Sequence, residues 1–389
     1  MQNVTLLLDL GNSETRFKLK YNDKEGKRVI TPVHTESNHF YKTEAGYEVP
    51  AIYTPDTTTI FNIVGEYSGT FANGLLVDRE FSTSFMKPTA NNKKYSFHSC
   101  LSFSLVYLKA ARILAQAWGV KPEELDINLD LVVLMPALDC DEDGIKAMEA
   151  ELRKITTVVD VFTVEGTTMR YDVKINNVEI YPEGLAAYVY CVYDETGEPR
   201  QGYEKYTEDV VLTLDIGAGT TDGCVIADGE LINNTRFTSS IGGNNVKAML
   251  KRLIKAKYNY GNIKDEQLEE AVKTGYIKDG SQQIDVAELV KTAKVDVAKM
   301  LVADIQDTLE TFGFSIRSIG SLLAVGGGTL GSDRPEIFPL SDSIAGFLKE
   351  FSPNLENVQL PVIKDENGQP VIMSTRLMNI NGACLLSES

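Results

Sequence analysis

Residues 212–222 read LTLDIGAGTTD, and this stretch decides the predicted fold. An apolar, strand-like run ends at Asp215, and a turn of two glycines and two threonines follows. A related stretch, LLLDLGNSETRFKL, occupies residues 6–19, and there the apolar run leads into Asp9. One chain therefore builds a strand–Asp–Gly turn twice, once in each half. A single copy would be read as an ordinary turn, but the repetition favours a shared function.

Each of these turns has the chemistry of a phosphate-binding loop. The glycine after the acid, Gly11 or Gly217, lets the backbone turn sharply and bring its N–H groups close to a bound group. Successive N–H groups in a turn form a concavity that binds anions, and Arg16 adds a permanent positive charge. The residues predicted to bind phosphate are Gly11, Asn12, Ser13, Thr15 and Arg16 in the first loop, and Gly217, Ala218, Gly219, Thr220 and Thr221 in the second.

The two acids that precede these loops predict a metal ion. Asp9 and Asp215 cannot contact phosphate directly, because like charges repel. They are explained if Mg²⁺ lies between them and the phosphates, since Mg²⁺ keeps several waters and takes few protein carboxylates. We therefore expect Asp9 and Asp215 to hold Mg²⁺ through water. The two loops would then grip one nucleotide in a cleft between two related domains.

A third glycine turn lies in SLLAVGGGTLG, residues 321–331, after another apolar run. Gly326, Gly328 and Gly331 match the dinucleotide pattern G-x-G-x-x-G, but no acid ends a second strand about twenty residues later. Residues 326–332 also lack the lysine of a P-loop. We interpret this segment as a turn that lets a flat ring, such as adenine, approach the backbone. The residues of this turn are Gly326, Gly327, Gly328 and Thr329.

Composition narrows the class of protein. A chain of 389 residues suits two domains, and its net charge of −17 disfavours direct binding to DNA, so that a link to DNA would need a basic partner. Five scattered cysteines without a CxxC pair are typical of a reducing compartment. The N-terminal apolar run stops at Asp9 without a basic region before it, and no run of about 18 apolar residues occurs. We expect a cytoplasmic protein without a membrane span.

Strands and helices alternate in both halves, which predicts α/β layers. Residues 99–118 form a helix that is apolar nearly all round and should be buried, and 285–313 show the period of a long amphipathic helix. A strand is expected at 160–166. The polar segment 194–208 is the best candidate for a link between domains. The predicted domains are 1–195 with about 352–389, and 196–351.

Three motifs together resemble one superfamily. DLGNSETR at 9–16, DIGAGTTD at 215–222 and LLAVGGGTL at 322–330 are similar to the two phosphate loops and the adenosine motif of the actin and Hsp70-like ATPases. Their order and spacing match across nearly the whole chain. The resemblance implies an actin-like, ribonuclease-H-like α/β fold of two domains with a nucleotide cleft between them. It also implies ATP or GTP with Mg²⁺ as ligand, and hydrolysis of that nucleotide.

Within the superfamily, the length and the segment IYPEGLAA at 180–187 are most similar to ParM-type plasmid-segregating bacterial actins. In those relatives a Pro-Glu opens a helix and the Glu orients the attacking water, which here is Glu183. The catalytic residues implied are Glu183, Asp215 and Asp9. Without the resemblance, Glu183 would equally suit a first-turn acid favoured by the helix dipole.

The resemblance also places part of SIGGNNVKAMLKRLIKA, residues 240–256, near the nucleotide. The residues implied there are Gly243, Lys251 and Arg252, although the last two would equally suit a solvated helix face. The sequence departs from many relatives at Ser13, where they have Gly, and at Arg16, where they have Lys. Because Arg binds phosphate bidentately, the geometry of the first loop should differ there.

The resemblance finally implies that subunits join head-to-tail into filaments, a contact that does not close on itself. Polymer growth would segregate plasmid DNA through an adaptor protein bound to centromere-like DNA. The alternatives are another actin-like ATPase, such as a cell-shape or phage actin, a chaperone-like ATPase, a nucleotide-binding scaffold, and a sugar- or acetate-type kinase. A kinase would need a substrate-holding acid between the domains, and no such constellation is apparent in the sequence.

Overall fold

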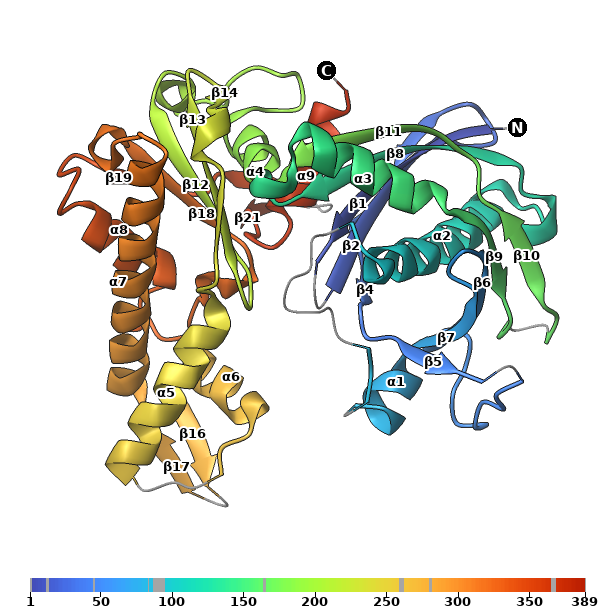
Figure 1. Cartoon of the computed structure of the whole chain (residues 1–389), viewed down its shortest axis with the longest axis horizontal. Coiled ribbons are helices and arrows are strands. Elements are labelled where there is room, and N and C mark those ends of the chain that lie inside the picture. Colours follow the sequence, from blue (N-terminus) through green and yellow to red (C-terminus); the bar gives the residue numbers. More distant parts are fainter. Residues whose placement is uncertain are drawn as a thin grey trace. The chain divides into compact units, whose positions relative to one another are not determined.

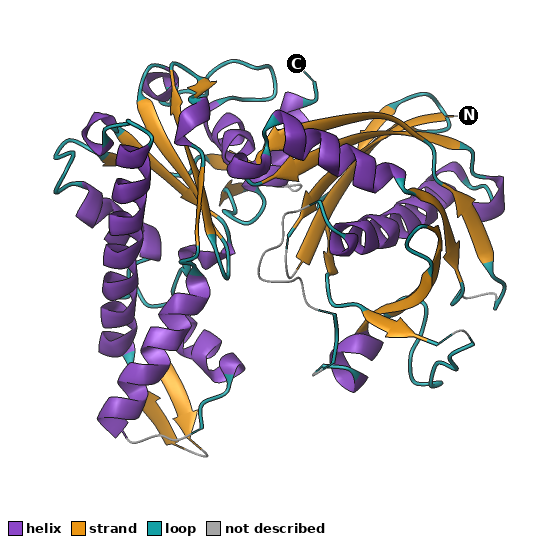
Figure 2. Cartoon of the chain, viewed as in Figure 1, coloured by secondary structure: helices purple, strands orange, loops and turns teal. Residues whose placement is uncertain are grey.

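The chain packs as two compact units in the computed structural model, which describes residues 2–11, 14–44, 46–82, 84–86, 95–163, 166–258, 262–279, 282–364 and 369–388 (Figure 1). The first unit extends to Pro182 except for Pro136–Leu138. The second contains Pro136–Leu138 and Glu183–Ser387. Both units combine sheets with helices, as the alternating pattern predicts (Figure 2).

The first unit is built on a mixed sheet. Its strands are β1 (Gln2–Leu10), β2 (Glu14–Asn22), β3 (Arg28–Ile30), β4 (His34–Ser37), β8 (Ile127–Met135) and β11 (Ile175–Pro182). They follow the order β11-β8-β1-β2-β3, with β4 also paired to β2. Strand β1 runs antiparallel to β2 and parallel to β8, and its apolar run is buried because both of its faces are covered.

A second sheet and several helices complete this unit. The strands are β5 (Tyr41–Thr43), β6 (Thr58–Gly65), β7 (Gly69–Gly74), β9 (Ile155–Asp160) and β10 (Met169–Asp172), in the order β10-β9-β6-β7-β5. The helices are α1 (Leu75–Glu80), α2 (Phe97–Trp118) and α3 (Glu142–Arg153). Strand β9 ends at Asp160, where the predicted strand 160–166 was expected to begin, so that prediction is wrong. The β-branched run before Asp160 is the part that pairs with β6.

Helix α2 confirms the buried helix predicted for residues 99–118. Among the residues that the structure describes, it is the single helix with the length and apolar composition to cross a membrane, and most of it is buried inside the first unit. It ends at Gly119, whose left-handed backbone (φ 56°) is the common end of an α-helix. This burial is that of a core helix.

The second unit is built on another mixed sheet. Its strands are β12 (Val210–Ile216), β13 (Thr221–Ala227), β14 (Glu230–Leu231), β15 (Phe237–Ser239), β18 (Ser321–Val325) and β19 (Glu356–Asn357). The order is β14-β13-β12-β18-β19, with β15 paired to β13. Strand β12 runs antiparallel to β13 and parallel to β18. Asp228 and Gly229 form the turn between β13 and β14, and both have positive φ, as a two-residue turn of this kind requires.

Helices and two small hairpins pack around this sheet. The helices are α4 (Glu183–Val192), α5 (Gly243–Tyr258), α6 (Asp265–Thr274), α7 (Ala287–Thr311), α8 (Leu340–Leu348) and α9 (Met378–Leu386). The hairpins are β16 (Tyr276–Asp279) with β17 (Gln282–Asp285), and β20 (Val362–Lys364) with β21 (Pro370–Ile372). Short 3-10 turns lie at Pro122–Glu124, Ala137–Asp139, Glu204–Thr207, Asn233–Thr235, Ile316–Ser318 and Gly327–Thr329. The long α7 confirms the helical period predicted for 285–313.

The compact units divide the chain at Glu183, the first residue of α4. Helices α4 and α9 lie in the second unit because they pack on each other, and α4 also packs on β12 and β13. Segment 194–208 lies in the same unit, where the Tyr188 hydroxyl donates to the Tyr206 carbonyl at 2.9 Å. The domain division from the sequence, 1–195 with about 352–389 and 196–351, stays a prediction.

Candidate functional site

The first loop joins β1 to β2 in the first unit. Asp9 is 4% exposed and pairs in register with Arg16 across the two strands. The Arg16 guanidinium lies 3.4 Å from the Asp9 carboxylate and 2.8 Å from the Glu14 carboxylate. A Cβ atom on Gly11 would lie 2.5 Å from the Glu14 carbonyl oxygen, so this turn requires glycine. Arg16 is therefore held beside the loop by two carboxylates.

A buried asparagine that the sequence analysis did not single out supports this loop. Asn38 is 1% exposed and donates from its amide to the Gly11 carbonyl. Its Oδ1 accepts from the Thr15 hydroxyl at 2.8 Å and from the Ser102 hydroxyl of α2 at 3.0 Å. Thr15 is fully buried, so its hydroxyl supports the loop from inside the unit. The predicted phosphate-binding residues Asn12 and Ser13 lie outside the described residues.

The second loop joins β12 to β13 in the second unit. Asp215 pairs in register with Asp222, and the Gly217 N–H donates to the Thr220 carbonyl at 2.8 Å and closes the turn. Ala218 and Gly219 form an exposed tip. Thr221 is fully buried, and its hydroxyl donates to the Ile241 carbonyl at 2.6 Å. The exposed backbone of the tip is the part that can approach an anion.

Helix α5 begins directly against this loop. The Gly243 N–H donates to the Gly217 carbonyl at 3.0 Å, and the Asn244 N–H donates to the Ala218 carbonyl at 2.7 Å. The first turn of a helix of this length carries a partial positive charge, which favours anions nearby. Lys251 and Arg252 lie two turns along α5 with exposed side chains, as residues of a solvated face do.

The third glycine turn packs on the second loop. Strand β18 ends at Val325, which lies beside Asp215 in the parallel register. A Cβ atom on Gly328 would lie 2.3 Å from the Gly217 carbonyl oxygen, so the two turns touch through their backbones. The Thr329 hydroxyl donates to the Gly326 carbonyl at 2.9 Å. Three segments that the sequence analysis assigned to the nucleotide thus converge at the carboxyl ends of β12 and β18, the edge of an α/β sheet where ligands bind.

The segment leading into α9 adds residues that sequence reasoning missed. The Gly326 N–H donates to the Thr375 carbonyl at 3.2 Å, and the Arg376 Nε lies 3.4 Å from the place that a Cβ atom of Gly327 would occupy. Asn379 donates from its amide to the Asp215 carboxylate. Asn379 lies in α9, and Thr375 and Arg376 precede it. None of the three belongs to a motif, so no local signal could have found them.

Glu183 begins α4 and is 5% exposed. A first-turn acid held only by the helix dipole is ordinarily solvated, so burial of this carboxylate requires partners inside the protein. Helix α4 packs closely on the sheet, because a Cβ atom on Gly184 would lie 2.6 Å from the Thr213 hydroxyl oxygen. Glu183 is therefore held in one place by the elements around it.

The carboxylates of the candidate site suit a cation that is bound through its water molecules better than one bound directly by protein oxygens. Within the described ranges, no group of three or more His, Cys, Asp or Glu side chains gathers as a metal cluster would. Asp215 presents one carboxylate beside the Gly326 turn, where a Cβ atom would lie 2.3 Å from its Oδ1. A single carboxylate among backbone turns suits Mg²⁺ that keeps most of its waters.

Comparison with known proteins identifies the fold. Residues 213–331 match the family model described as archaeal actin homologue MreB-like, C-terminal. The archaeal actin homologue Ta0583 is 18% identical, with a TM-score of 0.65 over 99% of this chain and 100% of that chain. A non-polymerisable quadruple mutant of pCBH ParM is 16% identical, with a TM-score of 0.57 over 99% of each chain.

Bacillus thuringiensis ParM with ATP is 15% identical, with a TM-score of 0.57 over 100% of this chain and 98% of that chain. No curated protein matches the sequence. Similarity over the full length of several actin homologues shows that this chain has the actin-like α/β fold, as the three motifs imply.

Proposed function

We propose that this chain is an actin-like nucleotide-binding protein that hydrolyses ATP or GTP and assembles head-to-tail into filaments. One observation carries the proposal: the second loop, the Gly326 turn and the start of α5 converge around Asp215 in one unit. These are the segments that would contact the phosphates, the base and the ribose. Backbone contacts between two glycine turns and the start of a helix support a site that binds a ligand through its main chain.

The second loop binds the phosphates through backbone N–H groups at its exposed tip, and the start of α5 adds a favourable partial charge. The glycines of the Gly326 turn have no side chains, so the base can lie directly against the backbone there. Mg²⁺, when bound with the nucleotide, would neutralise phosphate charge, and Asp215 and Asp9 are the residues that would hold it through water. The first loop, with Arg16, is proposed to bind the same phosphates.

Glu183 is proposed to orient the water that attacks the terminal phosphate. A buried carboxylate at a helix start can accept a hydrogen bond from that water and align it. The 5% exposure of Glu183 supports this role over that of a solvated first-turn acid. The terminal phosphate favours the conformation of the protein that assembles, because both loops bind it. Hydrolysis removes these contacts, and assembly is thereby coupled to hydrolysis.

Self-assembly is supported by the fold and by one relative that was obtained as a non-polymerisable mutant. A head-to-tail contact does not close on itself and produces a filament. We further propose that the filaments segregate plasmid DNA through a basic adaptor protein. The net charge of −17 disfavours direct contact with DNA and supports contact through an adaptor.

Sedimentation tests the proposal. The purified protein is centrifuged with Mg-ATP, Mg-GTP, Mg-ADP or no nucleotide, and the pellets are imaged by electron microscopy. We expect pelleting and filaments that depend on a nucleoside triphosphate, and phosphate release in the same samples. Asp215→Ala should weaken binding of the metal–nucleotide complex and abolish the pellet. Turnover that requires a sugar or acetate, without a pellet, would contradict the proposal and indicate a kinase.

A further inference from the structure

Asn379 in helix α9 carries a buried amide that the proposed function has not used. Its side chain is 6% exposed, and its Nδ2 donates to Asp215 Oδ2. Its Oδ1 is buried and has no hydrogen-bond partner in the part of the chain that the structure describes. The NH₂ group of the amide therefore has a partner in the candidate site, whereas the amide oxygen has no donor.

The orientation of this amide follows from chemistry. A carboxylate ionised at neutral pH only accepts hydrogen bonds, so the NH₂ group of Asn379 must face Asp215 and the carbonyl must face away from it. A buried carbonyl without a donor is unfavourable, and native proteins rarely keep one unless water or a ligand supplies the donor. The free Oδ1 therefore indicates a donor that joins the protein from outside.

The surroundings of Asn379 indicate which ligand brings that donor. The chain just before α9 is bound to the Gly326 turn, because Thr375 accepts from the Gly326 N–H at 3.2 Å and donates from its hydroxyl to the Gly326 carbonyl at 3.3 Å. Asp215, at the other end of the Asn379 bond, is the proposed metal-site acid. The other buried unpartnered side-chain atoms among the described residues, in Thr59, Asn62 and His98, belong to the first unit.

We propose that Asn379 is a nucleotide-site residue with two roles. Through Nδ2 it orients the Asp215 carboxylate, and through Oδ1 it accepts a hydrogen bond from the bound metal–nucleotide complex. The donor is an O–H group of that complex, either a metal-bound water or a ribose hydroxyl. This inference rests on the proposed nucleotide binding and adds to it a residue at the far end of the chain.

The test combines one substitution with three ligands. Asn379→Leu keeps the approximate volume and removes both the donor and the acceptor. Calorimetry measures the Kd of the wild type and the variant for ATP with Mg²⁺, for ATP with EDTA, and for 2′,3′-dideoxy-ATP with Mg²⁺. A matched control is Asn357→Leu, because Asn357 also donates to a carboxylate of the second unit, that of Asp342 at 2.9 Å.

We expect Asn379→Leu to weaken binding of ATP with Mg²⁺ by about tenfold or more, the effect of losing one or two hydrogen bonds. The loss should shrink to about threefold or less in EDTA if the donor is a metal-bound water, or with the dideoxy ligand if it is a ribose hydroxyl. Either pattern supports the inference. The Asn357→Leu control should change all three affinities by less than about twofold.

An equal loss with all three ligands would overturn the inference, because it would show a purely structural role, and so would no loss at all. If Asn379→Leu does not fold, as circular dichroism would show, Asn379→Asp replaces it. That variant removes the donor to Asp215, keeps an acceptor, and is expected to lose affinity chiefly with Mg²⁺ present. If the wild type binds none of the three, the measurements are repeated with the corresponding guanine nucleotides, and a wild type that binds neither set overturns the proposed function together with this inference.

Discussion

Lys294, about two turns from the start of helix α7, donates a hydrogen bond from its ammonium group to the carbonyl oxygen of Leu330 at 2.6 Å. A second bond runs to the carbonyl of Phe338 at 3.0 Å. Leu330 directly follows the glycine turn and has a left-handed backbone (φ 54°), which is unfavourable for leucine. Lys294 is 1% exposed, so a buried cation holds this strained loop beside the candidate site.

Replacing Lys294 should change how stability depends on pH. Burial lowers the pKa of Lys294 to about 8, against the opposing charge of Asp342. Between about pH 8 and the ordinary lysine value, the unfolded chain holds more protons than the folded one, so stability rises with pH across this window. Between pH 7 and 9.5, we expect the free energy of unfolding of the wild type to rise by about 2 kcal/mol relative to that of Lys294→Met. Urea unfolding at several pH values measures this difference.

The control for this measurement is Lys299→Met, on an exposed turn of the same helix. The free energy of unfolding of Lys299→Met should differ from that of the wild type by the same amount throughout this pH range. If the gap between Lys294→Met and the wild type did not change with pH, the pKa of Lys294 would be the same in the folded and the unfolded chain, and the lowering of its pKa by burial would be wrong.

Gly328→Ala should damage the candidate site through a backbone collision. The new Cβ atom would lie 2.3 Å from the Gly217 carbonyl oxygen, and backbone on both sides leaves no flexible group to move. We expect nucleotide affinity to fall by more than about tenfold, and unfolding to become easier by about 1–3 kcal/mol. Gly346→Ala, in α8, is the matched control, because no atom lies within 4 Å of its Cβ position and it lies outside the candidate site. Equal affinities of the two variants would show that the turns do not need to touch.

Glu183→Ala should separate binding from hydrolysis. If this buried carboxylate orients the attacking water, its loss leaves nucleotide affinity within about threefold and slows phosphate release by about 10²-fold or more. Single-turnover phosphate release, measured beside equilibrium binding, distinguishes the two effects. Glu195→Ala, in an exposed turn after α4, provides the control. Unchanged phosphate release in Glu183→Ala would remove Glu183 from catalysis.

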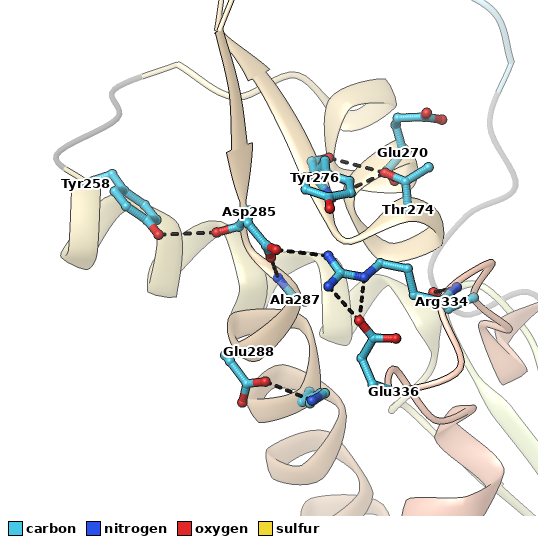
Figure 3. A network of polar contacts seen from close by, with 11 residues as sticks. Tyr258, Glu270, Thr274, Tyr276, Asp285, Ala287, Glu288, Arg334 and Glu336 are labelled. Atoms are coloured by element: carbon cyan, nitrogen blue, oxygen red, sulfur yellow. Dashed lines mark hydrogen bonds and ion pairs between the residues drawn. The ribbon is translucent and has the colours of Figure 1, made fainter.

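Arg334 joins the chain that follows the glycine turn to the β16–β17 hairpin (Figure 3). Its guanidinium contacts Asp285 at 3.1 Å and Glu336 at 2.7 Å, and lies 4.9 Å from the centre of the Tyr276 ring. Lysine cannot reproduce the two-pronged contact of the guanidinium with both carboxylates, so Arg334→Lys should lower stability slightly and speed hydrogen exchange in the hairpin. Arg170→Lys, at an exposed pair with Asp172, is the control and should have almost no effect. Unchanged exchange in the hairpin would show that the network is not structural.

The sequence alone determined where the three glycine turns lie and which segments form the main strands and the long helices. An apolar run that stops at an acid and a glycine is local chemistry, and so is the period that produces α7, since each depends on neighbours within a few residues. Those local signals located both loops and the Gly326 turn, and the resemblance of these motifs to a known superfamily implied the actin-like fold. The strand expected at 160–166 failed because pairing with β6 selected the segment before it.

The tertiary structure decided which distant side chains meet. Asn38, Lys294 and Asn379 each bind a predicted loop or its acid from another element, and nothing in their local sequence distinguishes them from ordinary polar residues. Such contacts depend on strand register and helix packing, which one sequence does not specify residue by residue. Burial removes water as an alternative partner for these groups, so the fold, and not the motif, determines what each of them binds.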